Sequence, residues 1–181
     1  TVILFIGRLN RDKGVLDLAT AFANIASSQT YLVMVGEAED VSFETIKRIC
    51  GLHCEKLRGI GFTSDPGRYM AAADILCLPS YREGFGQVII EAAASGVPTV
   101  ASRIYGITDA VEDGKTGLLF PAGDIAALTQ ALLKLIKDRD LAKQLGAAAR
   151  LRALDLFPSQ KISEAMISFY SDLLEEERVN H

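Results

Sequence analysis

The sequence predicts an α/β fold built on a doubly wound parallel β-sheet of about six strands. Short apolar runs alternate along the chain with segments of helical periodicity, which is the order of a parallel sheet with helical crossovers. The runs are continuously apolar, so each strand should be buried on both faces of the sheet. These features are typical of a Rossmann-like domain, in which ligands bind at the carboxyl ends of the strands.

Six apolar runs predict strands over 2–6, 31–35, 57–62, 75–78, 99–102 and 117–120. Helical patterns cover 15–29, 42–54, 67–73, 86–95, 124–137, 139–156 and 159–178. Asp124 supplies an N-cap signal, and Pro158 separates the last two helices, of which Ser159 can cap the second. We therefore expect a Rossmann-like domain over 1–158 and a helical C-terminal segment over 159–181.

The composition narrows the function classes. Hydrophobic residues make up 49% of the 181 residues, which is enough for a substantial core, and the net charge of −4 argues against nucleic acid as the main partner. Three cysteines show no disulfide framework, which favours a reducing, cytoplasmic setting. No apolar run approaches 18 residues, so a membrane span is not expected. The start at Thr1, directly before a strand, indicates a piece of a longer protein.

A cationic loop follows the first predicted strand. Arg8, Arg11 and Lys13 lie between Gly7 and Gly14, where a doubly wound fold binds ligands. Arg8 can make a forked contact to phosphate oxygens, and Lys13 can add a point charge. The loop lacks a dinucleotide fingerprint, and a simple solvated loop is an equally good interpretation of this segment alone.

The stretch after the fourth predicted strand is the most informative. Glu83 precedes Gly84, Phe85 and Gly86, and Glu91 follows in the predicted helix. A helix N-terminus behind a glycine-rich turn offers free N–H groups to phosphate, while carboxylates accept hydrogen bonds from hydroxyls. Glu83 could instead be only a favourable charge at the helix end. The apolar neighbours of Glu91 predict a partly buried carboxylate, which favours a functional role.

Two other motifs give little evidence of a functional site. Lys115 lies in a sequence that resembles the end of a P-loop, but the required glycine is replaced by Asp109 and no strand-to-helix turn surrounds it, so a polar turn is expected. Cys50, His53 and Cys54 lack a second pair of ligands, so we expect no zinc site and assign both cysteines to packing.

Together these residues resemble the nucleotide-sugar-binding, C-terminal domain of a GT-B-fold retaining glycosyltransferase of family 4, the glycosyl transferases group 1. The resemblance covers nearly the whole chain. Five stretches carry it: Gly7-Arg8-Leu9 with Lys13-Gly14; Val35-Gly36; Gly59-Ile60-Gly61-Phe62 with Ala73-Asp74; Leu78-Pro79-Ser80 with Glu83-Gly84-Phe85-Gly86 and Glu91-Ala92; and Asp113-Gly114 with Thr116-Gly117-Leu118-Leu119.

The resemblance implies a role for each matching residue. Arg8 and Lys13 would hold the donor diphosphate, Glu83 would contact the transferred sugar, and Glu91 would accept hydrogen bonds from the ribose. The implied catalytic residues are Glu83, Arg8 and Lys13. The implied donor-binding residues are Gly7, Arg8, Lys13, Ile60 in the base pocket, Glu83, Gly84, Phe85 and Gly86 through backbone N–H groups, and Glu91. No metal and no cofactor are implied, because the two cations would take the place of a divalent ion.

The implied function is transfer of a sugar from a nucleotide diphosphate sugar to an acceptor hydroxyl, in polysaccharide or glycolipid synthesis. The acceptor, a sugar or lipid-linked sugar, would bind a missing N-terminal half, to which the helix over 159–178 would cross. The domain alone should be inactive, and the full enzyme would be cytoplasmic with room for peripheral membrane contact. Tyr105 replaces a glycine common in the family, which leaves the sugar open. A nucleotide-sugar epimerase of the same architecture and a non-catalytic nucleotide-sugar-binding module are the alternatives.

Overall fold

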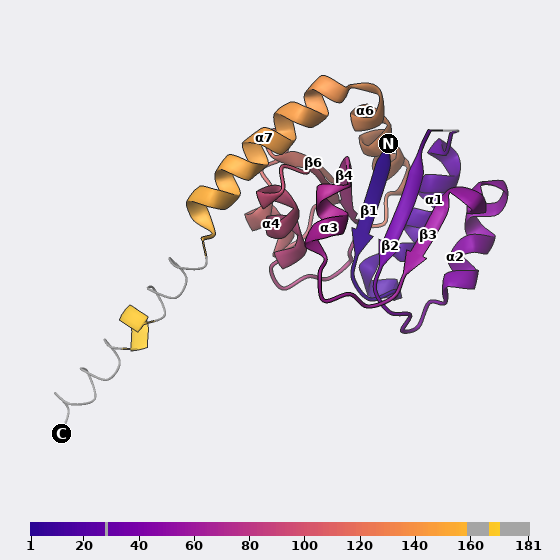
Figure 1. The fold of residues 1–181 in the computed structure, drawn as a ribbon, viewed down its shortest axis with the longest axis horizontal. Coiled ribbons are helices and arrows are strands. Elements are labelled where there is room, and N and C mark those ends of the chain that lie inside the picture. The colour runs from indigo at the N-terminus through magenta and orange to yellow at the C-terminus, as the bar shows by residue number, and fades with distance from the viewer. Residues whose placement is uncertain (28, 159–166, 171–181) are drawn as a thin grey trace.

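A computed structural model describes residues 1–27, 29–158 and 167–170. Its centre is a six-stranded parallel sheet in the order β3-β2-β1-β4-β5-β6. The strands are β1 (Val2–Ile6), β2 (Tyr31–Val35), β3 (Leu57–Ile60), β4 (Ile75–Leu78), β5 (Thr99–Ser102) and β6 (Gly117–Phe120). Figure 1 shows β1, β2 and β3 running downward, so that their carboxyl ends lie at the lower edge of the sheet, away from the N-terminus.

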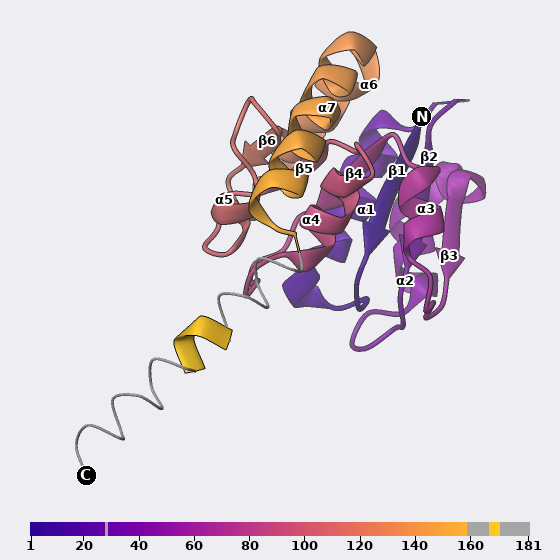
Figure 2. The same cartoon turned by 60° about the vertical axis from the view of Figure 1, so that its left-hand side comes forward.

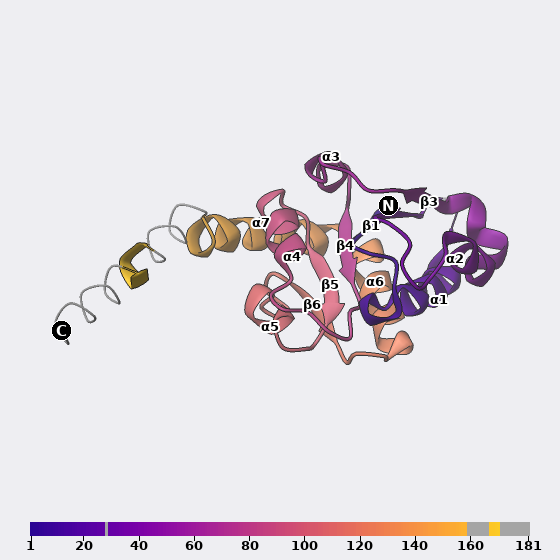
Figure 3. The ribbon, with the colours of Figure 1, turned by 90° about the horizontal axis from the view of Figure 1, so that it is seen from below.

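Helices cover both faces of this sheet. They are α1 (Val15–Ile25), α2 (Phe43–Cys50), α3 (Gly67–Ala71), α4 (Gln87–Ala94), α5 (Ile107–Ala110), α6 (Ile125–Lys137) and α7 (Arg139–Leu156), with 3-10 turns η1 (Arg11–Lys13) and η2 (Gly51–Lys56). Helix α1 contacts α2 and α6, whereas α4 contacts α3 and α7. Figure 2 shows α7 alongside α4, and Figure 3 shows α1 and α6 on the opposite side of the sheet from α3.

The core explains why the apolar runs become strands. Ile3, Leu4 and Phe5 of β1 are fully buried, and every residue of β4 is buried, as expected for strands covered on both faces. Leu128 and Leu132 of α6, which are one helical turn apart, are also fully buried and contribute to this core. The predicted α/β fold with six parallel strands is therefore confirmed.

Several predicted boundaries were too long. The third strand ends at Ile60 because its pairing with β2 stops there, and Phe62 beyond it is 77% exposed. The helix predicted over 15–29 ends at Ile25. The helix predicted over 42–54 ends at Cys50, because Gly51 adopts a φ of 56° and begins a 3-10 turn. The prediction missed α5, whose four residues are too few to show periodicity.

The structure describes only part of the C-terminal region for which helices were predicted. Helix α7 ends at Leu156, where the sequence predicted it to end. The helix predicted over 159–178 lies outside the described residues, apart from 167–170, which are helical. Within the part of the chain that the structure describes, no helix is both long and apolar enough to cross a membrane.

Strand order also locates the place where a ligand would bind. The chain winds outward from β1 to β3 and then returns to place β4 on the other side of β1. The loops that leave β1 and β4 therefore diverge to opposite faces of the sheet, and a crevice opens between them at the carboxyl edge. The cationic loop leaves β1 and the loop of Glu83 leaves β4, so both border this switch point.

Candidate functional site

The loops after β1 and β4 are fastened to each other. Tyr81 donates its backbone N–H to the carbonyl of Asp12 over 2.7 Å, and its hydroxyl donates to Asp17 Oδ2 over 2.6 Å. That second hydrogen bond raises the pKa of the Tyr81 hydroxyl. Gly14 makes the approach possible, because a Cβ there would lie 2.0 Å from the carbonyl oxygen of Pro79.

The loops bring Lys13 and Glu83 together. Lys13 Nζ forms an ion pair with Glu83 Oε1, and the two side chains are only 21% and 11% exposed. Ser80, which is buried, donates its hydroxyl to the same carboxylate oxygen over 3.1 Å. An ammonium group has three N–H donors, so Lys13 can keep Glu83 and still bind an anion. The site thus holds a cation and a carboxylate in fixed positions beside each other.

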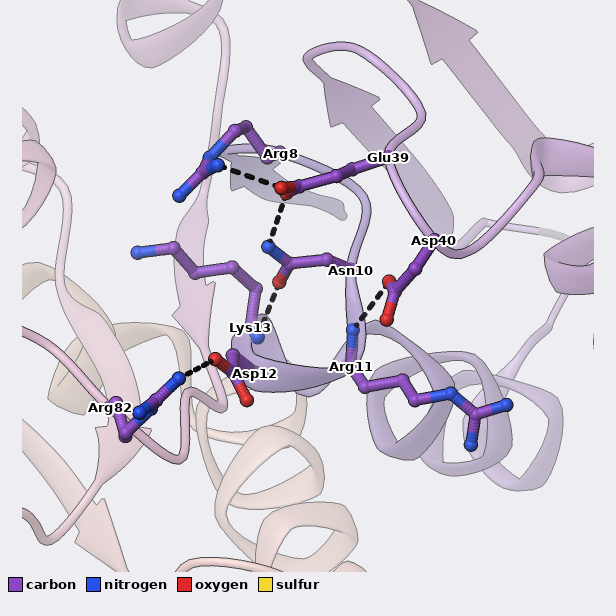
Figure 4. A network of polar contacts seen from close by, with 8 residues as sticks. All are labelled: Arg8, Asn10, Arg11, Asp12, Lys13, Glu39, Asp40 and Arg82. Carbon is purple, nitrogen blue, oxygen red and sulfur yellow. Dashed lines mark hydrogen bonds and ion pairs between the residues drawn. The ribbon is translucent and has the colours of Figure 1, made fainter.

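Arg8 projects from the same loop. Its side chain is 68% exposed and donates from Nη1 to Glu39 Oε1 over 2.9 Å. Figure 4 shows the side chains of Arg8 and Lys13 extending to the same side of the loop, whereas Arg11 points away from them. The loop therefore presents two cations on one side, and Arg11, the third cation of the predicted loop, is not one of them.

The N-terminus of α4 adds hydrogen-bond donors. Gly86 is the N-cap of this helix with a φ of 65°, and Gly84 precedes it in the loop that begins at Glu83. Among the residues that the structure describes, the backbone N–H groups of 84–88 have no protein acceptor. Free N–H groups at the positive end of a helix favour an anion or a hydroxyl oxygen. The predicted contacts through Phe85 and Gly86 have donors available for them.

Glu91 lies one turn further along α4. Its side chain is partly buried, as its apolar neighbours predicted, and Oε1 accepts a hydrogen bond from Gln87 Nε2 over 3.1 Å. One carboxylate oxygen is therefore already engaged by the helix itself. The other retains its lone pairs for a ligand.

An apolar cavity of about 370 Å³ opens beside the cationic loop. It is lined by Leu9, Gly36, Glu37, Ala38, Phe43, Gly59, Ile60 and Gly61, at the carboxyl ends of β1, β2 and β3. Ile60 therefore lines a pocket, and Leu9 joins that pocket to the loop of Arg8. Gly59 leaves room for the ring of Phe43, which a Cβ would approach to 2.6 Å. An apolar slot of this kind accepts a flat ring.

Tyr105 lies beside the loop that carries Glu83. Gly106, with a φ of 84°, packs against the loop of Glu83, and a Cβ there would lie 2.5 Å from the carbonyl oxygen of Gly84. The preceding residue, Tyr105, is strongly exposed. Tyr105 thus lies next to the turn that carries Glu83.

Other sequence features lie elsewhere. Lys115 belongs to a polar turn before β6, paired with Glu112 at 3.3 Å, so the P-loop alternative is excluded there. Cys50 is buried, which raises its pKa to about 11, but Cys54 is exposed, so the assignment of both cysteines to packing was wrong for Cys54.

Three functional candidates were missed. Ser80 holds Glu83, Asn10 caps η1 by accepting from the Lys13 N–H over 2.9 Å, and Glu39 binds Arg8. Asn10 stands three residues before Lys13, which is a detectable N-cap signal. Ser80 and Glu39 follow strand ends, a position that marks loop residues but does not say what they contact.

Comparison with known proteins shows which family has this arrangement. Residues 1–152 match the family model described as glycosyl transferases group 1. The chain belongs to this family. The resemblance to the glycosyl transferases group 1, drawn from five short motifs, is therefore confirmed.

Relatives of this glycosyltransferase chain are longer than it is. It is 33% identical over 178 residues to the capsular polysaccharide biosynthesis glycosyltransferase CapM of Staphylococcus aureus, covering 97% of this chain and 47% of that protein. It is 31% identical over 180 residues to N-acetyl-alpha-D-glucosaminyl L-malate synthase of Bacillus anthracis, covering 98% of this chain and 47% of that protein. The chain spans about half the length of the curated relatives it matches.

Solved structures share the fold. Sucrose-phosphate synthase from Thermosynechococcus elongatus superposes with a TM-score of 0.85 at 33% identity, covering 97% of this chain and 46% of that one. HepE of Anabaena, solved in complex with UDP and glucose, superposes with a TM-score of 0.86 at 28% identity. The match covers 94% of this chain and 48% of HepE. The chain thus has a Rossmann-like fold that matches the structures of GT-B glycosyltransferases.

Proposed function

We propose that this chain is the donor-binding domain of a retaining glycosyltransferase that transfers a sugar from a nucleotide diphosphate sugar to an acceptor hydroxyl. The ion pair of Lys13 and Glu83 at the switch point is the observation that carries the proposal. It places a group suited to phosphate beside a group suited to sugar hydroxyls, at the junction of the donor's two parts.

The three parts of the donor fit three neighbouring features. The base enters the cavity lined by Ile60, the diphosphate lies along Arg8 and Lys13, and the sugar lies against Glu83 and the N–H groups of Phe85 and Gly86. Glu91 accepts a hydrogen bond from the ribose. Gly7 and Gly84 keep the backbone of both loops free of side chains near the phosphates.

In the transfer step, the bond between the anomeric carbon and the diphosphate oxygen breaks, and the acceptor oxygen bonds to that carbon on the same face. Negative charge develops on the leaving phosphate, where Lys13 and Arg8 stabilise it. Glu83 orients the sugar, and its contact with Lys13 couples that orientation to the leaving group. The acceptor's proton passes to the leaving diphosphate.

The remaining parts of the proposal concern the whole enzyme. The unit that binds the donor is residues 1–158, and 159–181 belong to the contact with an acceptor-binding half. That half takes a sugar or lipid-linked sugar, with peripheral contact to the cytoplasmic face of a membrane, in polysaccharide or glycolipid synthesis. The domain alone binds donor without transferring the sugar, because one wall of the cleft is absent.

Calorimetric titration of the 181-residue chain with UDP, GDP and ADP tests donor binding. We expect one of them to bind with a Kd of about 1 μM to 1 mM, the range of typical KM values for enzyme substrates. The nucleoside alone should bind more weakly, because it cannot reach Arg8 and Lys13. Failure of all three diphosphates to bind would contradict the proposal.

Repeating the titration in excess EDTA and in excess magnesium tests metal independence. Two protein cations serve the diphosphate, and among residues 1–27, 29–158 and 167–170 no group of three or more His, Cys, Asp or Glu is placed to hold a metal. Affinity for the nucleoside diphosphate should be the same in EDTA and in magnesium, or lower in magnesium because the metal competes with the protein for the phosphates. Tighter binding with magnesium would show that a metal bridges the protein and the donor.

Replacement of Glu91 tests the ribose contact. Glu91→Gln keeps the shape of the side chain but loses the charge-assisted hydrogen bond, so affinity for the nucleoside diphosphate should fall by about 1–2 kcal/mol. The unmutated chain should bind the 2′,3′-dideoxy diphosphate as weakly as Glu91→Gln binds the ordinary one. The variant should distinguish the two nucleotides less than the unmutated chain does, because its amide oxygen still accepts one neutral hydrogen bond. If the unmutated chain also fails to distinguish them, Glu91 does not bind the ribose.

A further inference from the structure

The loop after β2 is held against the cationic loop by its backbone. Leu9 donates its N–H to the carbonyl of Glu37 over 2.7 Å, and Glu39 donates its own N–H to the carbonyl of Leu9 over 3.1 Å. Val41 donates to the same carbonyl over 3.1 Å. The Cα of Glu39 is therefore fixed beside the residue that follows Arg8.

Both oxygens of the Glu39 carboxylate are occupied. Oε1 accepts from Arg8 Nη1 over 2.9 Å, and Oε2 accepts from Asn10 Nδ2 over 2.7 Å. Figure 4 shows the three side chains in this order, followed by the bond from Asn10 to the Lys13 backbone. A continuous chain of hydrogen bonds thus runs from the Arg8 guanidinium through Glu39 and Asn10 to the backbone N–H of Lys13.

Asn10 fixes which groups donate and which accept along this chain of hydrogen bonds. It is 8% exposed, and its Oδ1 accepts the Lys13 N–H, which can only donate. Its Nδ2 must therefore face Glu39, and Glu39 must accept from both sides. A carboxylate meets this demand, whereas a side-chain amide, with one acceptor and one donor, does not.

Exposed ion pairs usually contribute little, because two long side chains must be ordered to form them. Glu39 differs, since a nearly buried amide and the backbone already order it. It is the only partner that the described part of the chain offers to the Arg8 guanidinium group. Holding one guanidinium nitrogen in advance removes part of the ordering cost of binding and leaves the other N–H donors for an anion.

We propose that Glu39 is a positioning residue, which orients Arg8 for the donor diphosphate. This inference rests on the proposed function. Glu39 touches no substrate and acts through Arg8. Its negative charge opposes phosphate binding, so the sign of the effect separates the two roles: loss of positioning weakens binding of a diphosphate, and loss of repulsion tightens it.

The test is a mutant cycle on the 181-residue chain, read by calorimetry with UDP or whichever of GDP and ADP binds it. Glu39→Gln should weaken binding about fivefold to twentyfold, the coupling expected of one contact that acts through a neighbour. Arg8→Ala should weaken it at least as much. In the Arg8→Ala background, Glu39→Gln should have no further effect, whereas a general loss of structure would add to it.

A compensating pair provides the control. Asn10→Asp alone places two carboxylates face to face and should also weaken binding. The double variant Asn10→Asp with Glu39→Gln keeps the net charge and rebuilds every hydrogen bond. Lys13 N–H donates to Asp, the Gln amide donates to Asp, and Arg8 donates to the Gln oxygen. Its affinity should return to within about threefold of the unmutated chain.

Each outcome decides the matter. Unchanged or tighter binding in Glu39→Gln, an undiminished effect of Glu39→Gln in the Arg8→Ala background, or no recovery in the double variant would overturn the positioning role while leaving donor binding intact. A chain that binds no nucleoside diphosphate at all would remove the proposed function, and the role of Glu39 with it.

Discussion

Gly14→Ala should destabilise the fold by about 3–4 kcal/mol and separate the two loops of the site. Gly14 has a φ of 66°, where an L-residue costs about 1 kcal/mol. The larger penalty comes from the new Cβ, which would lie 2.0 Å from the carbonyl oxygen of Pro79. Neither partner is a flexible side-chain end, so the backbone of one loop must move. Urea unfolding measures the loss.

Gly114→Ala is the matched control for this prediction. Gly114 has a similar φ of 74°, but a Cβ there meets nothing within 4 Å. Its replacement should therefore cost only about 1 kcal/mol, the backbone penalty alone. Equal losses of stability in the two variants would show that the contact between Gly14 and Pro79 does not hold the loops together.

Lys13→Ala should lower affinity for a nucleoside diphosphate by about 2–3 kcal/mol, or roughly 30- to 150-fold. The change removes a cation from the diphosphate. It also leaves the carboxylate of Glu83, only 11% exposed, with Ser80 as its remaining partner. An ionised group left without its counter-charge in such a place is unfavourable, so the stability of the fold should fall as well.

Two controls separate these effects. The double variant Lys13→Met with Glu83→Gln removes both charges, so stability should recover while affinity does not. Lys115→Ala breaks an exposed pair with Glu112 in the turn before β6 and should change neither quantity measurably. Normal nucleotide affinity in Lys13→Ala would contradict the role of Lys13 at the diphosphate.

The elements of the sheet were predictable because local pattern and tertiary burial agree. Runs such as 75–78 are apolar throughout, and the structure buries every residue of them. Strand ends were less predictable, because the pairing of Ile60 with Val35, and not the apolar character of Phe62, decides where β3 stops. Helix α5 has too few residues to produce a pattern.

The places of the candidate residues in the fold were predictable from the sequence, but their contacts were not. Lys13 and Glu83 could each be assigned to the carboxyl edge of the sheet, but their ion pair joins residues 70 apart in sequence. Glu39 carried no signal, because a carboxylate in a polar loop is usually solvated. Its contact with Arg8 depends on the backbone bonds that bring its loop to Leu9, which the sequence does not reveal.

Mapping of amide chemical shifts during titration with a nucleoside diphosphate tests the central claim most directly. The chain has other cavities of similar size, including one of about 340 Å³ at the opposite edge of the sheet, lined by Asp74, Gly96 and Arg139 among others. We predict that the shifts concentrate in 7–14, 83–88 and the residues around Ile60. Shifts centred on Asp74, Gly96 and Arg139, with the loops after β1 and β4 unchanged, would contradict a donor site at the switch point.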